Sequence, residues 1–245
     1  MKFVEMVPRD IDALKKDAAE ILNLFPEVTG FNIPDVLRLE NRSYDAVRSL
    51  LEIDIDAIPH IRCIDHPIPK TLDIITSLVD VGLTSVLLIS GDIPSSPSAE
   101  THPIKTTAVV EAVKSKLPNL NVYSALDPYR NSIQKELQYC QDKTNAGADG
   151  FFTQPFFDAR LASIYLEQLS KSTVFVGLSP VTSPQSYAYW ETKNHVVFPD
   201  TFEPNLAHNI QLGKHILGAT DEHKQHSYFM PIKTEPIPYL TGIFS

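Results

Sequence analysis

Short apolar runs alternate with longer amphipathic stretches along most of the chain. The apolar runs are rich in Val, Ile, Leu and Phe, which is typical of buried strands, and the stretches between them repeat apolar residues at helical spacing. We therefore predict strands at residues 3–8, 28–34, 57–65, 85–92, 121–127, 150–156, 174–181 and 227–232.

A helix is predicted after each of these strands. The ranges are 10–25, 43–52, 70–82, 104–116, 129–146, 158–170, 204–219 and 236–244, with a short additional helix at 184–193. Asp10 is a suitable N-cap for the first helix, and Gly82 closes the third. Eight strands that alternate with helices predict a (β/α)8 TIM barrel, here a single catalytic domain over residues 1–245. A doubly wound sheet is the rival fold, but the chain has no G-x-G-x-x-G stretch.

Composition and charge narrow the class of protein. The 245 residues are 43% hydrophobic, which is enough for a sizeable core, and the formal net charge is −9. A nucleic-acid or anionic-membrane partner is therefore not expected. The chain has neither a signal peptide nor an apolar run of about 18 residues, and we expect a cytoplasmic protein. Reduced thiols are favoured over a disulfide for Cys63 and Cys140.

Polar residues gather where the predicted strands end. The preceding halves of the strands are almost purely apolar, and sites in TIM barrels lie at the carboxyl ends of the strands. The residues at these ends are Glu5, Asn32, His60, Cys63, Asp65, Ser90, Asp92, Asp127, Thr153, Gln154, Ser179, Thr182 and Lys233.

Two carboxylates have the most informative positions. Glu5 has apolar neighbours on both sides, so its pKa is raised, as a general acid requires, unless a salt bridge holds it at the barrel end. Asp92 follows Gly91, which permits a tight turn, and its carboxylate either points into the mouth or caps the next segment.

The other candidate ligand contacts have two interpretations each. His60 and Cys63 lie on opposite faces of a strand and no second cluster completes a set, so no metal site is predicted. His60 is a hydrogen-bonding residue at the mouth or a structural histidine. Lys143 and Lys233 bind an anionic group or are solvated. Tyr187 stacks on a planar ligand or lies on the apolar face of a helix.

Several motifs, in order along the chain, resemble the methylenetetrahydrofolate reductase family. The most specific is AGADGFFTQPFFD at 146–158, and PHIRCID at 59–65, GDIP at 91–94 and GLSPVTS at 177–183 are similar to other family motifs. The resemblance extends from Glu5 to about Lys233. It implies a TIM barrel that reduces 5,10-methylenetetrahydrofolate to 5-methyltetrahydrofolate with electrons from NAD(P)H, normally through bound FAD.

The resemblance also implies roles for the folate side of the site. Glu5 matches the acid that protonates the folate ring, and Asp92 matches the aspartate that stabilises the cationic intermediate and contacts flavin and pterin. Gln154 matches the glutamine that binds the folate. Lys233 falls where the family usually has an arginine for the folate side chain. Tyr187 stands in for the family's aromatic after the seventh strand.

On the flavin side, the resemblance implies contacts from His60, Gly91 and Lys143. Asn32 is the candidate on the second strand, which lacks the usual Thr-Tyr pair. The departures from the family pattern also fall here: Ser90 replaces an arginine, and ALDPYRN at 125–131 replaces the usual fifth-strand segment.

Several outcomes therefore stay open. In the first, FAD binds through modified contacts. In the second, hydride passes directly from NAD(P)H to folate. In the third, the barrel serves as a folate-dependent methyltransferase or as a non-catalytic folate-binding subunit. The sequence also leaves open a homo-oligomer or a partner subunit.

Overall fold

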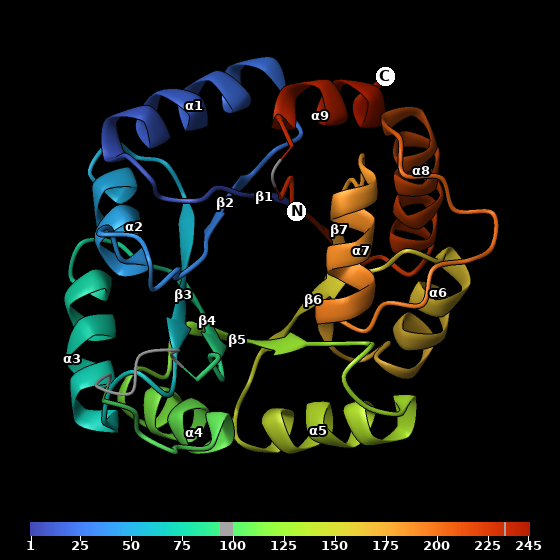
Figure 1. Cartoon of the computed structure of the whole chain (residues 1–245). Helices are drawn as coiled ribbons and strands as arrows, with labels where there is room; N and C mark the ends of the chain where they lie inside the picture. The colour runs from blue at the N-terminus through green and yellow to red at the C-terminus, as the bar shows by residue number, and fades with distance from the viewer. Residues whose placement is uncertain (94–99, 233) are drawn as a thin grey trace.

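The strands of a computed structural model, which describes residues 1–93, 100–232 and 234–245, form a closed parallel barrel in the order β1 to β8 (Figure 1). The strands are β1 (Lys2–Glu5), β2 (Gly30–Ile33), β3 (Ala57–Arg62), β4 (Ser85–Ile89), β5 (Asn121–Leu126), β6 (Gly150–Pro155), β7 (Thr173–Leu178) and β8 (His226–Phe229). Parallel pairing of β1 with β8 closes the cylinder. The predicted TIM barrel is thus confirmed.

Helices surround the barrel, and α9 completes the ring between α1 and α8 (Figure 1). Their bounds are α1 (Ile11–Leu24), α2 (Ser43–Leu51), α3 (Ile68–Val79), α4 (Thr106–Lys116), α5 (Ile133–Asn145), α6 (Ala159–Gln168), α7 (Pro184–Lys193), α8 (Leu206–Glu222) and α9 (Pro236–Phe244). Asp10 caps α1 as predicted, since its carboxylate accepts a hydrogen bond of 2.8 Å from the Ala13 amide.

The alternation of side chains along each strand produces two apolar layers. Outward residues such as Val4, Phe31 and Phe151 belong to the large cluster beneath the helices. Inward residues fill the cylinder, and this second cluster comprises Phe3, Ile58, Leu87, Tyr123, Phe152, Phe175, Tyr228 and Met230. The Phe152 and Phe175 rings stack at 4.1 Å between centroids. Because aromatic rings fill the cylinder, a polar site is expected at its carboxyl end and not in its interior.

Each of the strands ends one to three residues before its predicted carboxyl end. The prediction for the first strand ran to residue 8, whereas β1 ends at Glu5, because the ladder pairing stops where the chain enters the loops of the mouth. The helix predicted from residue 129 begins at Ile133, since the Ser132 side chain caps it by accepting from the Lys135 amide.

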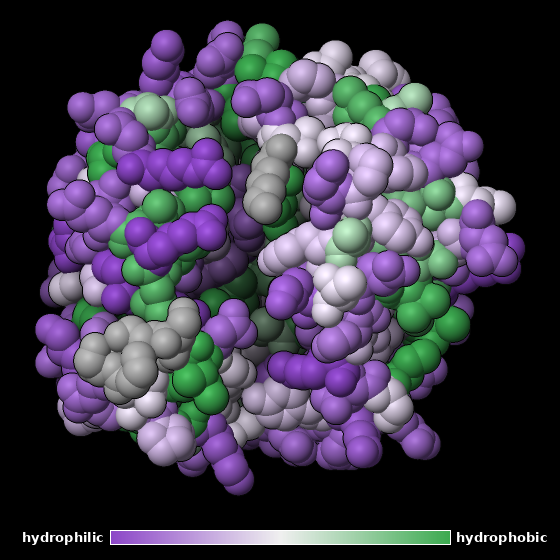
Figure 2. Space-filling view, in the orientation of Figure 1, coloured by the Kyte–Doolittle hydropathy of each residue, from purple (hydrophilic) through white to green (hydrophobic). Residues whose placement is uncertain are grey.

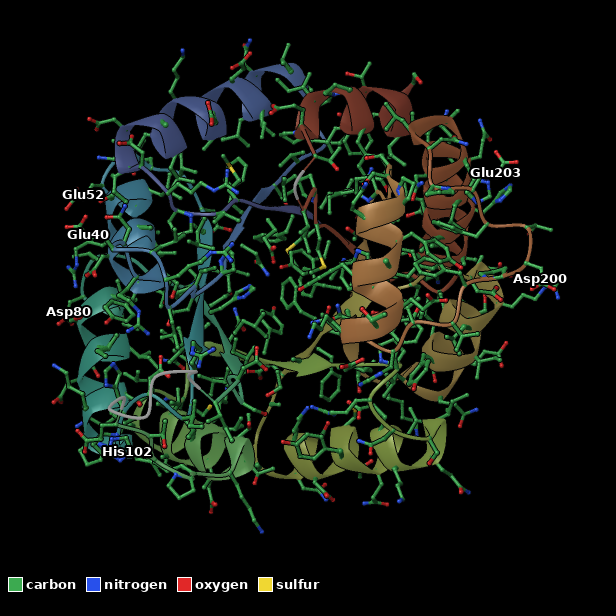
Figure 3. The ribbon with its side chains drawn as sticks, in the orientation of Figure 1. Glu40, Glu52, Asp80, His102, Asp200 and Glu203 are labelled. Carbon is green, nitrogen blue, oxygen red and sulfur yellow. The ribbon has the colours of Figure 1, made fainter. Side chains whose placement is uncertain are left out.

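Several acidic residues lie on the outside of the molecule. Glu40, Glu52, Asp80, Asp200 and Glu203 are exposed, and they lie at the outer edge of the molecule (Figure 3). Within the part of the chain that the structure describes, no helix has the length and apolar character needed to cross a membrane.

Candidate active site

Glu5 ends β1 and turns its carboxyl group toward the barrel interior. It lies beside Asn32 of β2 in the strand register. The Tyr228 hydroxyl donates a short hydrogen bond to one Glu5 carboxylate oxygen. Burial raises the pKa of Glu5 to about 7, and the Tyr228 hydrogen bond opposes the shift. A carboxyl group that holds its proton near neutral pH is suited to general acid catalysis.

Asn32 and His60 have buried polar atoms that make no normal hydrogen bond to a described residue. Asn32 is fully buried, and neither its amide nitrogen nor its oxygen makes a hydrogen bond of normal geometry to a described residue, although its side chain lies near enough to the Tyr228 hydroxyl to lower the pKa of that hydroxyl. Nε2 of His60 likewise makes no hydrogen bond to a described residue, and the His60 ring centroid lies 6.5 Å from that of Tyr228. Burial lowers the pKa of His60 to about 4, so the imidazole is neutral at pH 7. Buried polar atoms of this kind indicate a place for a ligand or water.

Gly91 and Asp92 form a corner just beyond the end of β4. Gly91 has φ of +83°, and a Cβ there would lie 2.7 Å from Ile64 Cγ2 and 3.1 Å from Arg62 Cζ, so glycine is required. The Asp92 carbonyl accepts a hydrogen bond of 2.5 Å from Arg62 Nη2. The Asp92 carboxylate is exposed and makes no hydrogen bond within the described ranges.

Gln154 is the last residue but one of β6, where the register with β7 shifts between Phe152 and Pro155. The hydroxyl of the neighbouring Thr153 accepts a hydrogen bond of 2.8 Å from the Gly177 amide. Gln154 is partly exposed, and its side-chain amide has no hydrogen bond to the residues described. The amide is therefore available to a ligand. Figure 2 shows the molecule hollowed at the centre of the ring of helices.

Glu5 also lines a cleft. It has a volume of about 510 Å³ and runs between α1 and the chain leading to α9, with Arg9, Leu14, Thr234 and Pro236 in its walls. Asp92 and Gln154 are not among the described residues that line this cleft. What Glu5, Asp92 and Gln154 share is thus their position at or just beyond the carboxyl ends of their strands.

Lys143 lies apart from this mouth. It is 2% exposed, between α5 and the barrel wall, where its ammonium donates a hydrogen bond of 2.5 Å to the Ala125 carbonyl. The Tyr139 ring covers it at 3.9 Å. Burial lowers the pKa of Lys143 to about 8.

Tyr187 and Lys233 complete the set of predicted ligand contacts. The Tyr187 ring stacks on Phe198, with 4.3 Å between centroids, and lies 5.9 Å from Phe202. This placement corresponds to the interpretation that Tyr187 belongs to the apolar face of its helix. Lys233 lies outside the described residues.

Tyr228 and Arg62 are two mouth residues that we did not single out in the sequence. The alternation of side chains along β8 could have placed Tyr228 on the inward face of the barrel. Arg62 follows His60 by two residues and therefore shares its inward face. The sequence does not reveal their hydrogen-bond partners, because these lie in other parts of the chain: Tyr228 binds Glu5, and Arg62 binds the Asp92 carbonyl.

Replacing Tyr228 with phenylalanine is expected to raise the pKa of Glu5. The hydroxyl donates to the ionised carboxylate and holds its pKa down, so its loss favours the protonated form. The alkaline limb of the profile of kcat/KM against pH should move upward by roughly one pH unit. A matched change at Tyr189, an exposed tyrosine of α7, should leave the profile in place. If the alkaline limb does not move in the Tyr228→Phe variant, Glu5 is not the group that titrates there.

The fold and the mouth together define the class of this protein: a TIM barrel whose strands carry, at their carboxyl ends, an acid of raised pKa and polar groups that make no hydrogen bond to a described residue. A family model described as "Methylenetetrahydrofolate reductase" matches residues 14–213. The chain therefore belongs to the methylenetetrahydrofolate reductase family. Glu5 and Tyr228 lie outside the matched range, while Asn32, His60, Asp92 and Gln154 lie within it.

Curated relatives agree with the family at low identity. A "Probable methylenetetrahydrofolate reductase (NADPH)" of Caenorhabditis elegans is 23% identical over 198 residues, covering 76% of this chain and 30% of the relative. A "5,10-methylenetetrahydrofolate reductase" of Buchnera aphidicola is 21% identical over 189 residues, covering 72% of this chain and 62% of the relative. The chain thus spans less than two thirds of the length of either relative.

Solved structures show the same fold. A crystal structure of oxaloacetate acetylhydrolase has a TM-score of 0.62 at 8% identity and covers 98% of this chain and 78% of its own. A putative phosphonomutase from Burkholderia cenocepacia has a TM-score of 0.54 at 13% identity, with 99% and 88% covered. These similarities concern the fold alone.

Proposed function

We propose that the protein reduces 5,10-methylenetetrahydrofolate to 5-methyltetrahydrofolate with electrons from NAD(P)H. The observation that carries this proposal is Glu5, a half-buried acid at the mouth of a barrel of this family, whose pKa desolvation raises to about 7. The reaction requires a proton donor whose pKa lies near neutral pH, and Glu5 has such a pKa.

The chemistry divides between two carboxyl groups. Glu5 donates its proton to N10 of the folate, which breaks the bond between N10 and the methylene carbon and leaves a cationic iminium on N5. Asp92 stabilises this cation electrostatically, since its carboxylate has no competing hydrogen bond to a described residue. Hydride then adds to the iminium carbon and produces the methyl group.

Gln154 and His60 serve binding in this proposal. The Gln154 amide has both a donor and an acceptor, which suits a pterin edge where donors and acceptors alternate. His60 is neutral at pH 7, so it offers a hydrogen bond without placing a positive charge beside the developing cation.

The residues suggested for flavin contact divide into two groups. Asn32 and His60 have buried polar atoms without a normal hydrogen bond to the residues that the structure describes, and these fit the edge of a flavin ring. Lys143 does not fit, because its ammonium is bound to the Ala125 carbonyl and covered by Tyr139. A bound flavin supplies a relay for hydride between NAD(P)H and the folate.

A flavin titration distinguishes these groups. We expect His60→Ala to weaken FAD affinity by about tenfold, as the loss of one hydrogen bond commonly does, and Lys143→Met to change it by less than about twofold. Flavin absorbance and fluorescence measure both. The reverse order of effects would contradict the assignment, and turnover by wild-type protein without any bound flavin would indicate direct transfer from NAD(P)H.

The function itself is tested by turnover. Purified protein, with and without added FAD, is incubated with 5,10-methylenetetrahydrofolate and NADH or NADPH, and the folate products are separated by chromatography. Formation of 5-methyltetrahydrofolate with matching loss of the reduced nicotinamide supports the proposal. Folate binding without turnover under any of these conditions would refute it.

A further inference from the structure

Arg62 joins the Gly91–Asp92 corner to the neighbouring strand. It ends β3, lies beside Ile89 of β4 in the register, and is 7% exposed. One arm of its guanidinium, Nη2, donates to the Asp92 carbonyl at 2.5 Å. Its Nε donates to both carboxylate oxygens of Asp65 at 3.1 Å. The guanidinium is thus held at two points, and one of them is the backbone of a proposed catalytic residue.

A second arginine secures Asp65 from the other side. Arg42 Nη2 lies 2.6 Å from an Asp65 oxygen, and Arg42 also binds both oxygens of Asp35, at 2.8 and 2.5 Å. Two arginines and two aspartates therefore alternate in one line of contacts, and their charges balance. Such fork-shaped contacts fix geometry better than a single point charge does.

Ser90 does not support the corner through Asp92. Its hydroxyl instead lies 3.2 Å from the Thr106 hydroxyl, at the start of α4. The side chain of Arg62 also packs against Gly91, where a Cβ would lie 3.1 Å from Arg62 Cζ and 3.2 Å from Arg62 Cβ. Arg62 therefore contacts two consecutive residues of the corner, Gly91 by packing and Asp92 by a hydrogen bond.

From this geometry we propose that Arg62 is a positioning residue that fixes the Asp92 carboxylate at the mouth. The inference rests on the proposed function, in which Asp92 stabilises the cationic intermediate. Arg62 acts through the Asp92 backbone. Loss of Arg62 therefore lowers the rate of the chemical step more than the affinity for folate, because Asp92 stabilises the charge that develops in the transition state.

The kinetic test compares Arg62→Gln and Arg62→Lys with Arg48→Gln. Arg48 is a suitable control, because it donates to the Ser77 carbonyl and hydroxyl at 3.1 and 2.9 Å between α2 and α3. We expect kcat to fall by about 10- to 100-fold in Arg62→Gln and KM to change by less than about threefold. Arg62→Lys should recover little, since one ammonium cannot reproduce the separate donations of Nε to Asp65 and of Nη2 to the Asp92 carbonyl. Asp65 keeps Arg42 as a partner in these variants, so folding is expected to persist.

A double mutant separates positioning from a merely structural role. In protein that already carries Asp92→Asn, Arg62→Gln should lower kcat by less than about threefold, because both changes remove the same contribution. Independent, multiplicative losses would overturn the proposal, and so would an Arg62→Gln variant with a normal kcat.

Hydrogen exchange provides a test that needs no turnover. The amides of Cys63 and Ile64, which donate to the Ile89 and Ser90 carbonyls at 2.8 and 3.2 Å, should exchange about tenfold faster in Arg62→Gln than in wild-type protein and remain unchanged in Arg48→Gln. Unchanged exchange in Arg62→Gln would refute the positioning role. If this result holds while no folate is reduced by the wild type, the proposed function fails and the role of Arg62 at the corner stands.

Discussion

Replacing Glu5 with glutamine is expected to slow the proposed reduction of folate by a factor of about 100 to 10,000, the usual contribution of a general acid. Glutamine has nearly the same shape and can still accept the Tyr228 hydrogen bond, but it has no proton to give to N10. Steady-state reduction of 5,10-methylenetetrahydrofolate measures the effect. Glu20→Gln, the same change at an exposed position of α1, serves as the control. A Glu5 variant that retains near wild-type turnover would disprove the assignment of the acid.

The same substitution should stabilise the protein at high pH. Burial raises the pKa of Glu5 from 4.5 to about 7, so the folded state binds the proton more tightly than the unfolded state. Below pH 4.5 both states are protonated and nothing is lost. As the pH rises to about 7, the unfolded state ionises first and the free energy of unfolding falls, by up to ~3 kcal/mol in total. Urea unfolding of wild type and Glu5→Gln at both ends of this range should show the variant gaining relative stability as the pH rises.

Replacing Asp92 with asparagine should slow folate reduction by about 100-fold, as the loss of a charge-stabilising group commonly does. Asparagine keeps the size of the side chain and leaves the backbone contact with Arg62 intact, so the change removes the charge alone. Single-turnover measurements separate the chemical step from binding. Asp80→Asn, at the outer edge of the molecule in Figure 3, is the matched control. A loss of less than about threefold would remove Asp92 from the chemistry.

The barrel could be predicted because each of its elements has a local signature. Strand-length apolar runs, helical periodicity between them and capping residues such as Asp10 are all contained in short stretches of chain. The ends of the elements were less accurate. Strand β1 stops at Glu5 because its neighbours offer no further pairing, and pairing depends on strands that are distant in sequence.

The candidate site was predictable to the extent that position along a strand decides it. Glu5, His60 and Gln154 are at or near strand ends, and the fold brings those ends to one rim. Lys143 illustrates the limit, because its place on α5 gave no indication that its ammonium would turn to the Ala125 carbonyl behind the barrel wall.

The sequence by itself determined the barrel, the rim on which polar residues gather and the family motifs. Only the tertiary structure decided which polar groups meet. Glu5 and its partner Tyr228 are 223 residues apart, and Arg62 reaches Asp92 across 30 residues from a neighbouring strand. Periodicity fixes the face on which a side chain lies, but closure of the cylinder fixes its neighbours. The raised pKa of Glu5 therefore arises from burial that the closed fold creates.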